Sequence, residues 1–263
     1  MPSIEKTEAL ALRIAPYSRT SHVVTWLSPT HGRLATMVKG ACRPRSAFLG
    51  RYDLFHTCEL LFYAREHNGL HIARECTPLR PRCHLRRDWR ASACASYMCD
   101  MLLRTSWRGN PQAGAYDLAE AALDALGTED DRLSLLFWFE LRLAQELGLA
   151  PQLVRCTACA GPLTSTGTGV FACDRGGLLC PRCTRDHRGG PLVRLPPDIL
   201  ALLRKWQQCP APAGIHALRA SSSQLLACRR ILGIFLEYYL DASPASRATA
   251  IATVQYDTER ACR

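Results

Sequence analysis

The chain has 263 residues, a hydrophobic fraction of 48% and a formal net charge of +10 at pH 7. We expect no signal peptide, because MPSIEKTEAL lacks a basic start and an apolar run, and we expect no membrane span, because no apolar stretch approaches the roughly 20 residues required. These features predict a soluble cytoplasmic protein with a polyanionic partner, most simply nucleic acid. An acidic protein partner is the alternative that the charge leaves open.

Residues 1–80 have the composition of a β domain. Turn-forming residues, among them Gly40, Pro44 and Asn68-Gly69, separate five strand-like runs. The predicted strands are Thr7–Ile14, Ser21–Leu27, Arg33–Val38, Leu54–Tyr63 and Leu70–Glu75. Five short strands in about 75 residues are typical of a small closed barrel, and the OB-fold is the commonest architecture of that kind.

The predicted barrel contains an unusual basic stretch. From Ala9 to Tyr52 there are 44 residues without an Asp or Glu. Within it, KGACRPRSAFLGR, residues 39–51, indicates a basic loop, because Gly40 and Pro44 keep it out of a strand. The side chains predicted to bind phosphates here are Arg33, Lys39, Arg43, Arg45 and Arg51. Stacking on unpaired bases and packing in the core are both open for Tyr17, Trp26, Phe48 and Tyr52.

Residues 81–263 read as a helical domain, because Pro78 and Pro81 interrupt the β pattern. Arg86 and Arg90 share a face at helical spacing, with Arg82 one turn earlier if the helix reaches it. These side chains would extend the nucleic-acid surface; a solvated helix face is the alternative. The predicted helices are Arg87–Arg104, Ala115–Leu126, Asp130–Leu147, Asp198–Gln207 and Ser222–Leu240. We expect loose order beyond Asp241.

Two CxxC pairs, Cys156 with Cys159 and Cys180 with Cys183, stand twenty residues apart. Two such knuckles supply four thiolates, the tetrahedral set that Zn²⁺ prefers in structural sites. The sequence therefore predicts a zinc module inserted at about residues 152–190. Two disulfides or a redox pair fit less well, because the chain has no secretory feature and neither pair follows a strand and opens a helix.

The sequence contains no recognisable catalytic constellation. Four thiolates fill the coordination of zinc and leave no position for a catalytic water. The chain lacks a GxxxxGK[ST] phosphate loop, an HExxH helix and a GxSxG elbow. We therefore predict that the protein is not an enzyme.

A basic N-terminal barrel and a Cys₄ site within a helical domain together resemble the RecO family of bacterial recombination mediators. The chain departs from the family pattern at Cys42, Arg45 and Ala160, where Arg, Lys and Gly are usual. The segments that carry the resemblance are Gly32-Arg33-Leu34, Lys39-Gly40-Ala41, Arg43-Pro44-Arg45-Ser46, the cysteine knuckles with Phe171 and Gly176-Gly177, Arg229-Arg230-Ile231-Leu232, and Ser246-Arg247.

The resemblance implies a multi-domain α+β fold: an N-terminal OB-fold barrel, then an α-helical domain that carries the inserted Cys₄ zinc module. It implies binding of single- and double-stranded DNA, annealing of complementary strands, and work with RecR and single-stranded-DNA-binding protein to load RecA. The hypothesis is thus a DNA-binding mediator. The rival hypothesis is a zinc-containing scaffold that docks acidic protein tails, and an RNA-binding OB protein is the third.

Overall fold

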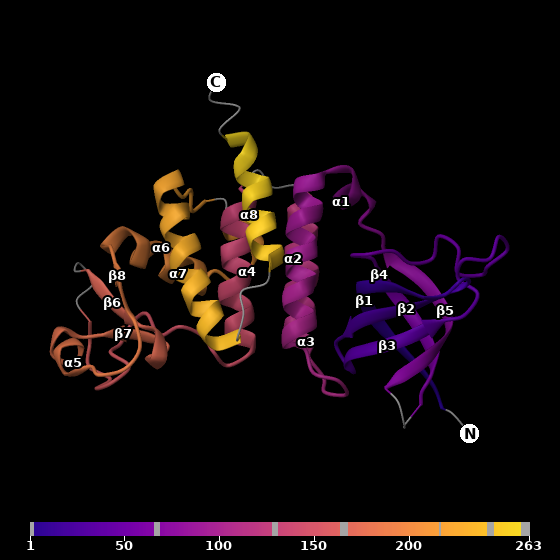
Figure 1. Cartoon of the computed structure of the whole chain (residues 1–263), viewed down its shortest axis with the longest axis horizontal. Coiled ribbons are helices and arrows are strands. Elements are labelled where there is room, and N and C mark those ends of the chain that lie inside the picture. Colours follow the sequence, from indigo (N-terminus) through magenta and orange to yellow (C-terminus); the bar gives the residue numbers. More distant parts are fainter. Residues whose placement is uncertain are drawn as a thin grey trace. The chain divides into compact units, whose positions relative to one another are not determined.

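A computed structural model describes residues 3–65, 69–127, 131–163, 168–215, 217–240 and 245–258. The chain divides into two compact units (Figure 1), Met1–Thr128 with Ala248–Arg263, and Glu129–Arg247. Within the described residues no helix combines the length and the apolar character that crossing a bilayer requires. The predicted domain limits, 1–80 and 81–263, stay predictions about independent folding.

The N-terminal barrel is closed by five strands in the order β1-β2-β3-β5-β4, as the OB-fold prediction requires. The pairing of β3 with β5 is parallel, and the other four pairings are antiparallel. The strands are β1 Ile4–Ser18, β2 Ser21–Ser28, β3 Gly32–Val38, β4 Thr57–Tyr63 and β5 Leu70–Arg80. Of the predicted Asn68-Gly69 turn, Asn68 lies outside the described residues, and Gly69 has a φ of 58°.

Alternation of side chains builds the barrel core. Along β3 the residues are buried and half-buried in strict alternation, as a strand with one face in a core must be. Trp26, Leu60 and Phe62 are the large side chains of the interior. The indole Nε1 of Trp26 donates a hydrogen bond to Thr36 Oγ1 at 2.9 Å, so its one polar group is satisfied inside.

The strand prediction was wrong at Pro78, which lies within β5 rather than after it. Beyond Ile72, β5 pairs only with β4, so its other edge needs no N–H donors for a ladder. Pro78 lies opposite Cys58, directly beside an irregularity in the register. Proline is tolerated at such edges and bulges because the missing N–H costs no ladder hydrogen bond.

Three helices follow the barrel in the first compact unit, to which most of α8 (Ala245–Thr258) also belongs: α1 Cys83–Arg87, α2 Trp89–Thr105 and α3 Ala113–Leu126. The helix predicted from Arg87 begins at Trp89, because the Asp88 carboxylate accepts the backbone N–H groups of Arg90 and Ala91 at 2.9 and 3.3 Å. Helix α2 contacts α3 and β1, and α3 contacts β2. The helices therefore pack directly on the barrel within this unit.

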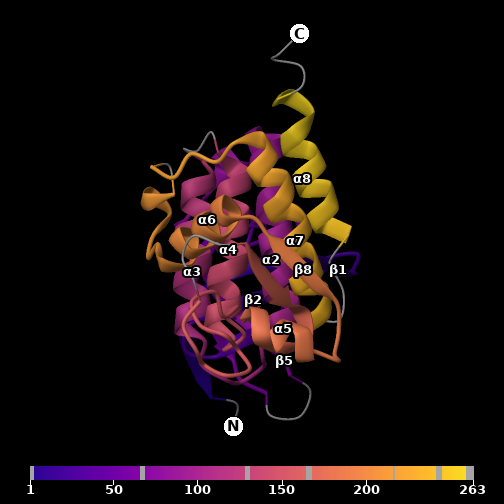
Figure 2. The ribbon, with the colours of Figure 1, turned by 90° about the vertical axis from the view of Figure 1, so that its left-hand side faces the viewer.

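The second compact unit combines helices with a small antiparallel sheet of order β7-β6-β8. In Figure 1, α7 lies between this sheet and α4, and Figure 2 views the unit from the side of the sheet and α5. The helices are α4 Arg132–Glu146, α5 Pro181–Asp186, α6 Pro197–Gln208 and α7 Ser222–Leu240, with 3₁₀ turns η1 Cys173–Arg175 and η2 Pro212–Gly214. The strands are β6 Gly169–Ala172, β7 Gly177–Leu179 and β8 Leu192–Leu195.

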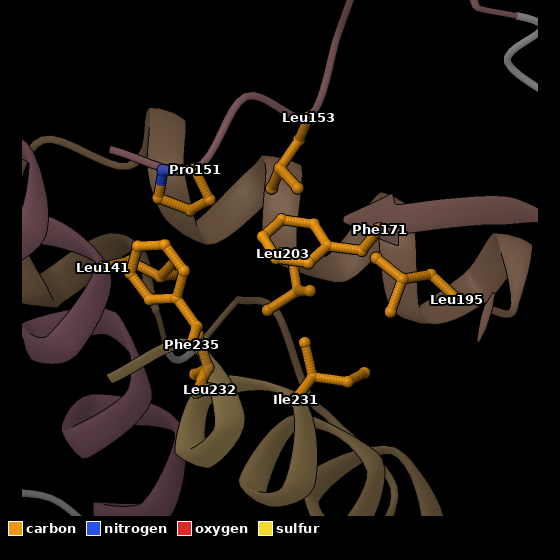
Figure 3. Close-up of a pocket in the computed structure, with 9 residues that line it drawn as sticks. All are labelled: Leu141, Pro151, Leu153, Phe171, Leu195, Leu203, Ile231, Leu232 and Phe235. Carbon is orange, nitrogen blue, oxygen red and sulfur yellow. The ribbon is translucent and has the colours of Figure 1, made fainter. Parts of the chain in front are cut away.

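One apolar cluster joins the helices of the second unit to the cysteine-bearing segment. Side chains from α4, α6, α7, β6, β8 and the segment after α4 point toward a common centre (Figure 3). The space left between them is only about 10 Å³, so this is a packed core rather than a ligand cavity. Phe171 of β6 meets Phe235 of α7 edge to face, with ring centroids 6.1 Å apart.

The expectation of loose order beyond Asp241 was wrong for Ala245–Thr258, which form α8; residues 241–244 and 259–263 lie outside the described residues. Arg247 in its first turn is buried and makes a two-pronged ion pair with Glu140 of α4, at 2.6 and 3.0 Å. Two parallel N–H···O bonds fix both position and orientation. This partner lies 107 residues away in the sequence, so local reading of the C-terminal segment had no sign of it.

Candidate metal centre and nucleic-acid interface

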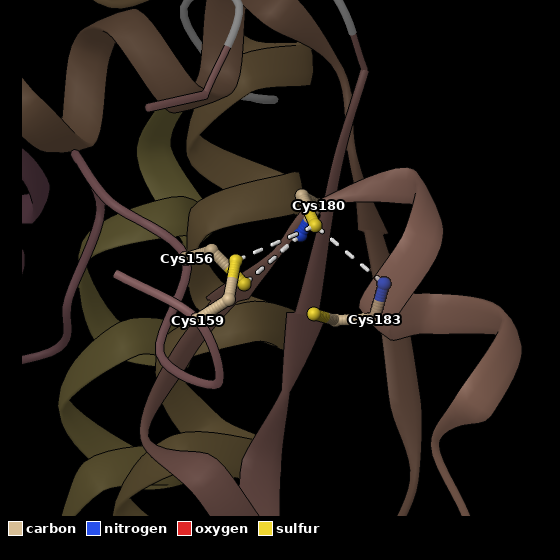
Figure 4. A group of neighbouring side chains, drawn as sticks. All are labelled: Cys156, Cys159, Cys180 and Cys183. Atoms are coloured by element: carbon tan, nitrogen blue, oxygen red, sulfur yellow. Dashed lines mark hydrogen bonds between the residues drawn. The ribbon is translucent and has the colours of Figure 1, made fainter. Parts of the chain in front are cut away.

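The four predicted zinc ligands converge in one cluster. Cys156 and Cys159 lie on a turn before β6, Cys180 directly follows β7, and Cys183 lies in the first turn of α5. The expectation that neither pair follows a strand and opens a helix was therefore wrong for Cys180 and Cys183, and the case for a metal depends on the convergence of all four thiols. Figure 4 shows the four side chains directed toward one another, and their sulfur atoms all lie within 4.8 Å of one another. The spacing of the two CxxC motifs thus becomes a set of four thiols around one point.

The geometry suits a tetrahedral Zn²⁺. Cys159 Sγ and Cys180 Sγ are 3.9 Å apart, and four Zn–S bonds of about 2.3 Å require separations of about 3.8 Å. The backbone N–H of Cys180 donates to Cys156 Sγ at 3.3 Å, and that of Cys183 donates to Cys180 Sγ at 3.5 Å. Such donors stabilise thiolate charge, and the all-sulfur set favours zinc over the hard cations that prefer oxygen.

The protonation of the cluster is uneven without a metal. Burial opposes the thiolate of Cys156, but backbone N–H groups of Cys180, Cys159 and Ala158 outweigh it and lower its pKa to about 6. The neighbouring Cys180 side chain, followed by burial, raises the pKa of Cys183 to about 12. A divalent cation removes this conflict, because it supplies the positive charge that adjacent thiolates lack.

The first knuckle is attached to the sheet by its backbone. Thr157 N donates to Leu178 O, and Leu178 N donates to Gln152 O, both at 2.9 Å. Ala160 follows this knuckle with a φ of 56°, in the left-handed region that glycine adopts most readily. This is the position where the family usually has Gly, so the departure noted in the sequence places a methyl group on a turn that favours glycine.

The basic loop between β3 and β4 presents its charges to solvent. Lys39, Arg43, Arg45 and Arg51 are all exposed. Successive backbone turns order the segment, with Arg43 N donating to Gly40 O at 3.1 Å, Ser46 N to Arg43 O at 3.0 Å and Arg51 N to Phe48 O at 3.1 Å. Four predicted cations therefore occupy one ordered loop of 13 residues, from 39 to 51.

Aromatic side chains attach this loop to the barrel rather than facing solvent. Phe48 and Tyr52 are partly buried against the barrel core, and Trp26 lies inside it. The Tyr52 hydroxyl also lies 2.8 Å from His22 Nδ1 of β2. Of the four aromatics considered for base stacking, Tyr17 is the exposed one, at 60%.

Arg82 does not lie on the predicted nucleic-acid surface. Arg82 is only 2% exposed. Its guanidinium group lies 2.5 Å from the Asp124 carboxylate and 3.2 Å from the Glu120 carboxylate. It also donates to Phe55 O at 2.9 Å and Thr57 Oγ1 at 3.0 Å. Burial opposes its charge, but the Asp124 and Glu120 carboxylates raise its pKa. Arg82 therefore links α3 to the barrel, and its buried guanidinium is not exposed to phosphates.

The other three predicted cations occupy separate places. Arg86 is exposed and pairs with Asp53, whereas Arg90 is half-buried and stacks over the Trp89 ring at 4.9 Å from its centroid. Trp89, the first residue of α2, is 54% exposed. Arg33 is half-buried on β3 and donates to the Leu103 carbonyl near the end of α2. The prediction that Arg86 and Arg90 share one helix face was wrong, because the extended residue Asp88 separates α1, which holds Arg86, from α2, which holds Arg90.

Comparisons with known proteins agree on one family. The model described as "Recombination protein O N terminal" matches residues 1–82, and that described as "Recombination protein O C terminal" matches residues 86–248. DNA repair protein RecO of Moorella thermoacetica is 30% identical over 250 residues, which are 94% of this chain and 91% of the relative. DNA repair protein RecO of Roseiflexus sp. is 30% identical over 248 residues, 93% of this chain and 84% of the relative.

Proposed function

The chain belongs to the RecO family of DNA repair proteins, and we propose that it is a non-enzymatic mediator that binds single- and double-stranded DNA, anneals complementary strands and assists the loading of RecA. The observation that carries this proposal is the exposed loop of Lys39, Arg43, Arg45 and Arg51 on a closed OB-type barrel. It acts in the bacterial cytoplasm, where the chromosome lies.

The proposed contacts are electrostatic and independent of base sequence. The cations of the loop neutralise phosphates and release condensed counterions, which makes the affinity fall as salt rises. Because the acid-free stretch Ala9–Tyr52 surrounds the loop, few carboxylates compete with the phosphates there. Neutralising the backbone charge allows two complementary strands to approach, which is the requirement for annealing. Arg86 and Arg90 with the exposed ring of Trp89 would extend this surface on the same unit.

The metal has a structural role in this proposal. Cys156, Cys159, Cys180 and Cys183 would hold Zn²⁺ and fill its four coordination positions. The ion would supply positive charge and a fixed tetrahedral geometry that link the two knuckles. The protein would then keep β7, α5 and the first knuckle together without any chemical step at the metal.

The direct test is annealing of complementary labelled oligonucleotides, followed by fluorescence at several salt concentrations. We expect wild-type protein to accelerate annealing and to bind more weakly as salt rises. The variant Arg43→Glu with Arg45→Glu reverses two exposed charges, so binding weakens and the salt slope falls by about 2. Unchanged binding and slope in this variant would overturn the loop assignment.

A matched control separates the loop from net charge. Arg74 and Arg219 are exposed residues outside the loop, and Arg74→Glu with Arg219→Glu makes the same change in total charge. We expect this control to retain most of the affinity and annealing. Titration with RNA oligonucleotides of the same sequence distinguishes a DNA mediator from an RNA-binding OB protein, since the latter binds RNA at least as well.

The partners in this proposal are RecR, single-stranded-DNA-binding protein and, indirectly, RecA. A hollow of about 370 Å³ along α7 favours a tail-docking role in the second unit. Its lining combines apolar Leu226 and Ile234 with Arg229, Arg230 and Arg247 against one acid, Glu237. Arg247 already pairs with Glu140, so Arg229 and Arg230 are the cations that would favour a peptide that is both acidic and apolar. The rival scaffold function would use this groove and would leave DNA binding incidental.

Titration of the full chain with an acidic tail peptide separates the two roles. Leu226→Asp should abolish peptide binding and leave annealing of bare oligonucleotides unchanged. If instead the loop variant Arg43→Glu with Arg45→Glu keeps full annealing and only peptide binding proves specific, the scaffold is the better description.

A further inference from the structure

A second basic feature of the first unit lies apart from the exposed loop. A pocket of about 350 Å³ is lined by residues of β1, β2 and β3 on one side and by the end of α2 and the residue stretch after it on the other. Four of its lining residues are arginines, and one is an acid. They are Arg13, Arg33, Arg104, Arg108 and Asp100.

The charges in this pocket are not balanced by the protein. Arg104 Nε lies 3.3 Å from Asp100 Oδ1, which accounts for the one carboxylate of the lining. The side chains of Arg13 and Arg108 have no hydrogen-bond or ion-pair partner within the described parts of the chain. Arg33 Nε is enclosed and also lacks a partner among the described residues. An enclosed donor without an acceptor is unfavourable, so an anion that accepts from Arg33 Nε is favoured, and the exposed Arg13 and Arg108 add positive charge beside it.

The positive charges of Arg33 and Arg108 repel each other across the pocket. Burial, followed by the positive charge of Arg108, lowers the pKa of Arg33. The position of Arg33 has a structural role, because one of its N–H groups donates to the Leu103 carbonyl near the C-terminal end of α2. That contact uses one donor of one guanidinium and leaves the positions of Arg13 and Arg108 unexplained.

The backbone holds the pocket in shape. Arg33 N donates to Trp107 O at 2.9 Å, and Gly109 N donates to His31 O at 3.1 Å. A Cβ on Gly32 would lie 2.6 Å from Trp107 O, so this close approach of the two segments requires glycine. These backbone hydrogen bonds hold Arg108 next to Arg33 before any ligand binds, which reduces the entropy lost on binding.

We infer that this four-arginine pocket is a second phosphate-binding site of the chain. Guanidinium groups suit phosphate oxygens because their planar N–H pairs match the spacing of those oxygens. The pocket lies on the β1–β3 side of the barrel, and OB-folds bind oligonucleotides across β2 and β3. Here α2 closes one side of that face, so a single phosphate group fits better than a strand that passes through.

The ligand is a phosphate of a nucleic-acid strand, and in that respect the inference rests on the proposed function. The phosphate has three possible sources: the terminal phosphate of a DNA strand, an internal phosphodiester, or free inorganic phosphate. A terminal phosphate carries about −1.5 to −2 charges at neutral pH, which suits a pocket with four guanidinium groups and one carboxylate better than the single charge of a diester.

The experiment uses the full-length variant Arg13→Ala with Arg108→Ala. Fluorescence anisotropy measures its affinity for three probes: a 5′-phosphorylated single strand, the same strand with a 5′-hydroxyl, and the hydroxyl strand in the presence of inorganic phosphate. Arg74→Ala with Arg219→Ala is the control that removes two exposed charges elsewhere. Thermal unfolding verifies that both variants keep their fold.

We expect the pocket variant to bind the 5′-phosphorylated strand about tenfold more weakly, because it loses arginine contacts to the phosphate. The dependence of the affinity on salt should also decrease, by about 1 in slope for each lost contact. An equal loss for both strands identifies an internal phosphodiester, and loss of competition by inorganic phosphate identifies the free ion. Wild-type affinity for every probe in a folded variant would overturn the inference.

The loop variant Arg43→Glu with Arg45→Glu keeps this result distinct from the proposed function. If the loop variant loses DNA binding and the pocket variant does not, the pocket inference fails and the mediator function stands. If both variants bind DNA as wild type does, the pocket inference and the assignment of the DNA surface to this unit fail together.

Discussion

The arginines of the loop at residues 39–51 and the buried arginines Arg82 and Arg247 have opposite surroundings. Arg43, Arg45 and Arg51 extend into solvent. Arg82 pairs with Glu120 and Asp124, and Arg247 pairs with Glu140. The first group is available to a polyanion, whereas the second holds segments of the chain together. The difference lies in carboxylates that are distant in sequence, so the number of arginines in a segment does not reveal their role.

This contrast also applies to the cysteine cluster. Like Arg82 and Arg247, the four sulfurs join segments that are distant in the chain, and their expected partner is an ion rather than DNA. Residues that bind DNA and residues that hold the fold should therefore respond differently to substitution. The first should change affinity without stability, and the second should change stability without the intrinsic affinity of the barrel.

The largest effect is expected for Cys180→Ser. It removes one of four zinc ligands, and binding of structural zinc contributes on the order of 10 kcal/mol. We expect bound zinc to fall to a small fraction of one equivalent, with unfolding of the second unit at lower temperature. Metal analysis and calorimetry measure the two effects, with Cys209→Ser as the control outside the cluster. DNA binding that disappears together with the metal would contradict the division of roles.

The next largest effect is expected for Arg82→Ala. It removes the buried guanidinium that pairs with both Glu120 and Asp124. Glu120 keeps Arg80 and Thr57 as partners, so we expect a loss of about 3 kcal/mol of the free energy of unfolding, the low end for a broken buried ion pair. Arg87→Ala, at an exposed position five residues later, should change that free energy by less than about 0.5 kcal/mol. Denaturant unfolding measures both. A large loss of DNA affinity in still-folded Arg82→Ala protein would show that Arg82 reaches DNA after all.

The loop variant Arg43→Glu with Arg45→Glu tests the other half of the comparison. Its free energy of unfolding should stay within about 0.5 kcal/mol of wild type, because both side chains are exposed. Its affinity for DNA at low salt should fall by about 100-fold through two lost contacts and two new repulsions. A drop in stability as large as that of Arg82→Ala would show that the loop charges also hold the fold.

The smallest effect concerns pH. Burial lowers the pKa of His56, Asp53 partly offsets this, and the charges of Arg82 and Arg86 lower it further. Above the unfolded-state pKa of about 6.5, His56 is neutral in both states and its contribution to stability is complete. As pH falls below that value the unfolded chain takes up a proton first, so the free energy of unfolding decreases.

We expect the free energy of unfolding of His56→Gln to change less with pH than that of wild type between about pH 7 and pH 5, the range in which an unfolded histidine titrates. Denaturant unfolding at several pH values measures the slope, and His84→Gln at an exposed position is the control. A slope identical to wild type in His56→Gln would assign the acid sensitivity to other groups.

Much of the architecture was predictable because it depends on local pattern. Turn-forming residues delimited the predicted strands Arg33–Val38 and Leu54–Tyr63, which lie close to β3 and β4, although β4 begins only at Thr57. The predicted helix Ser222–Leu240 has the bounds of α7. Other features depend on partners far away in the chain. Pro78 continues a strand because β5 has only one neighbour there, and Arg247 is buried because it pairs with Glu140, 107 residues earlier.

The closed barrel, the four clustered thiols and the basic loop could be predicted from the sequence, since each depends on spacing or on composition over a short range. The environment of each arginine could not, because it depends on the folded chain. Folding paired Arg82 with Glu120 and Arg247 with Glu140, and it collected Arg13, Arg33, Arg104 and Arg108 around one pocket. The physical reason is that a charge acts through its neighbours in space, and those neighbours are set by folding.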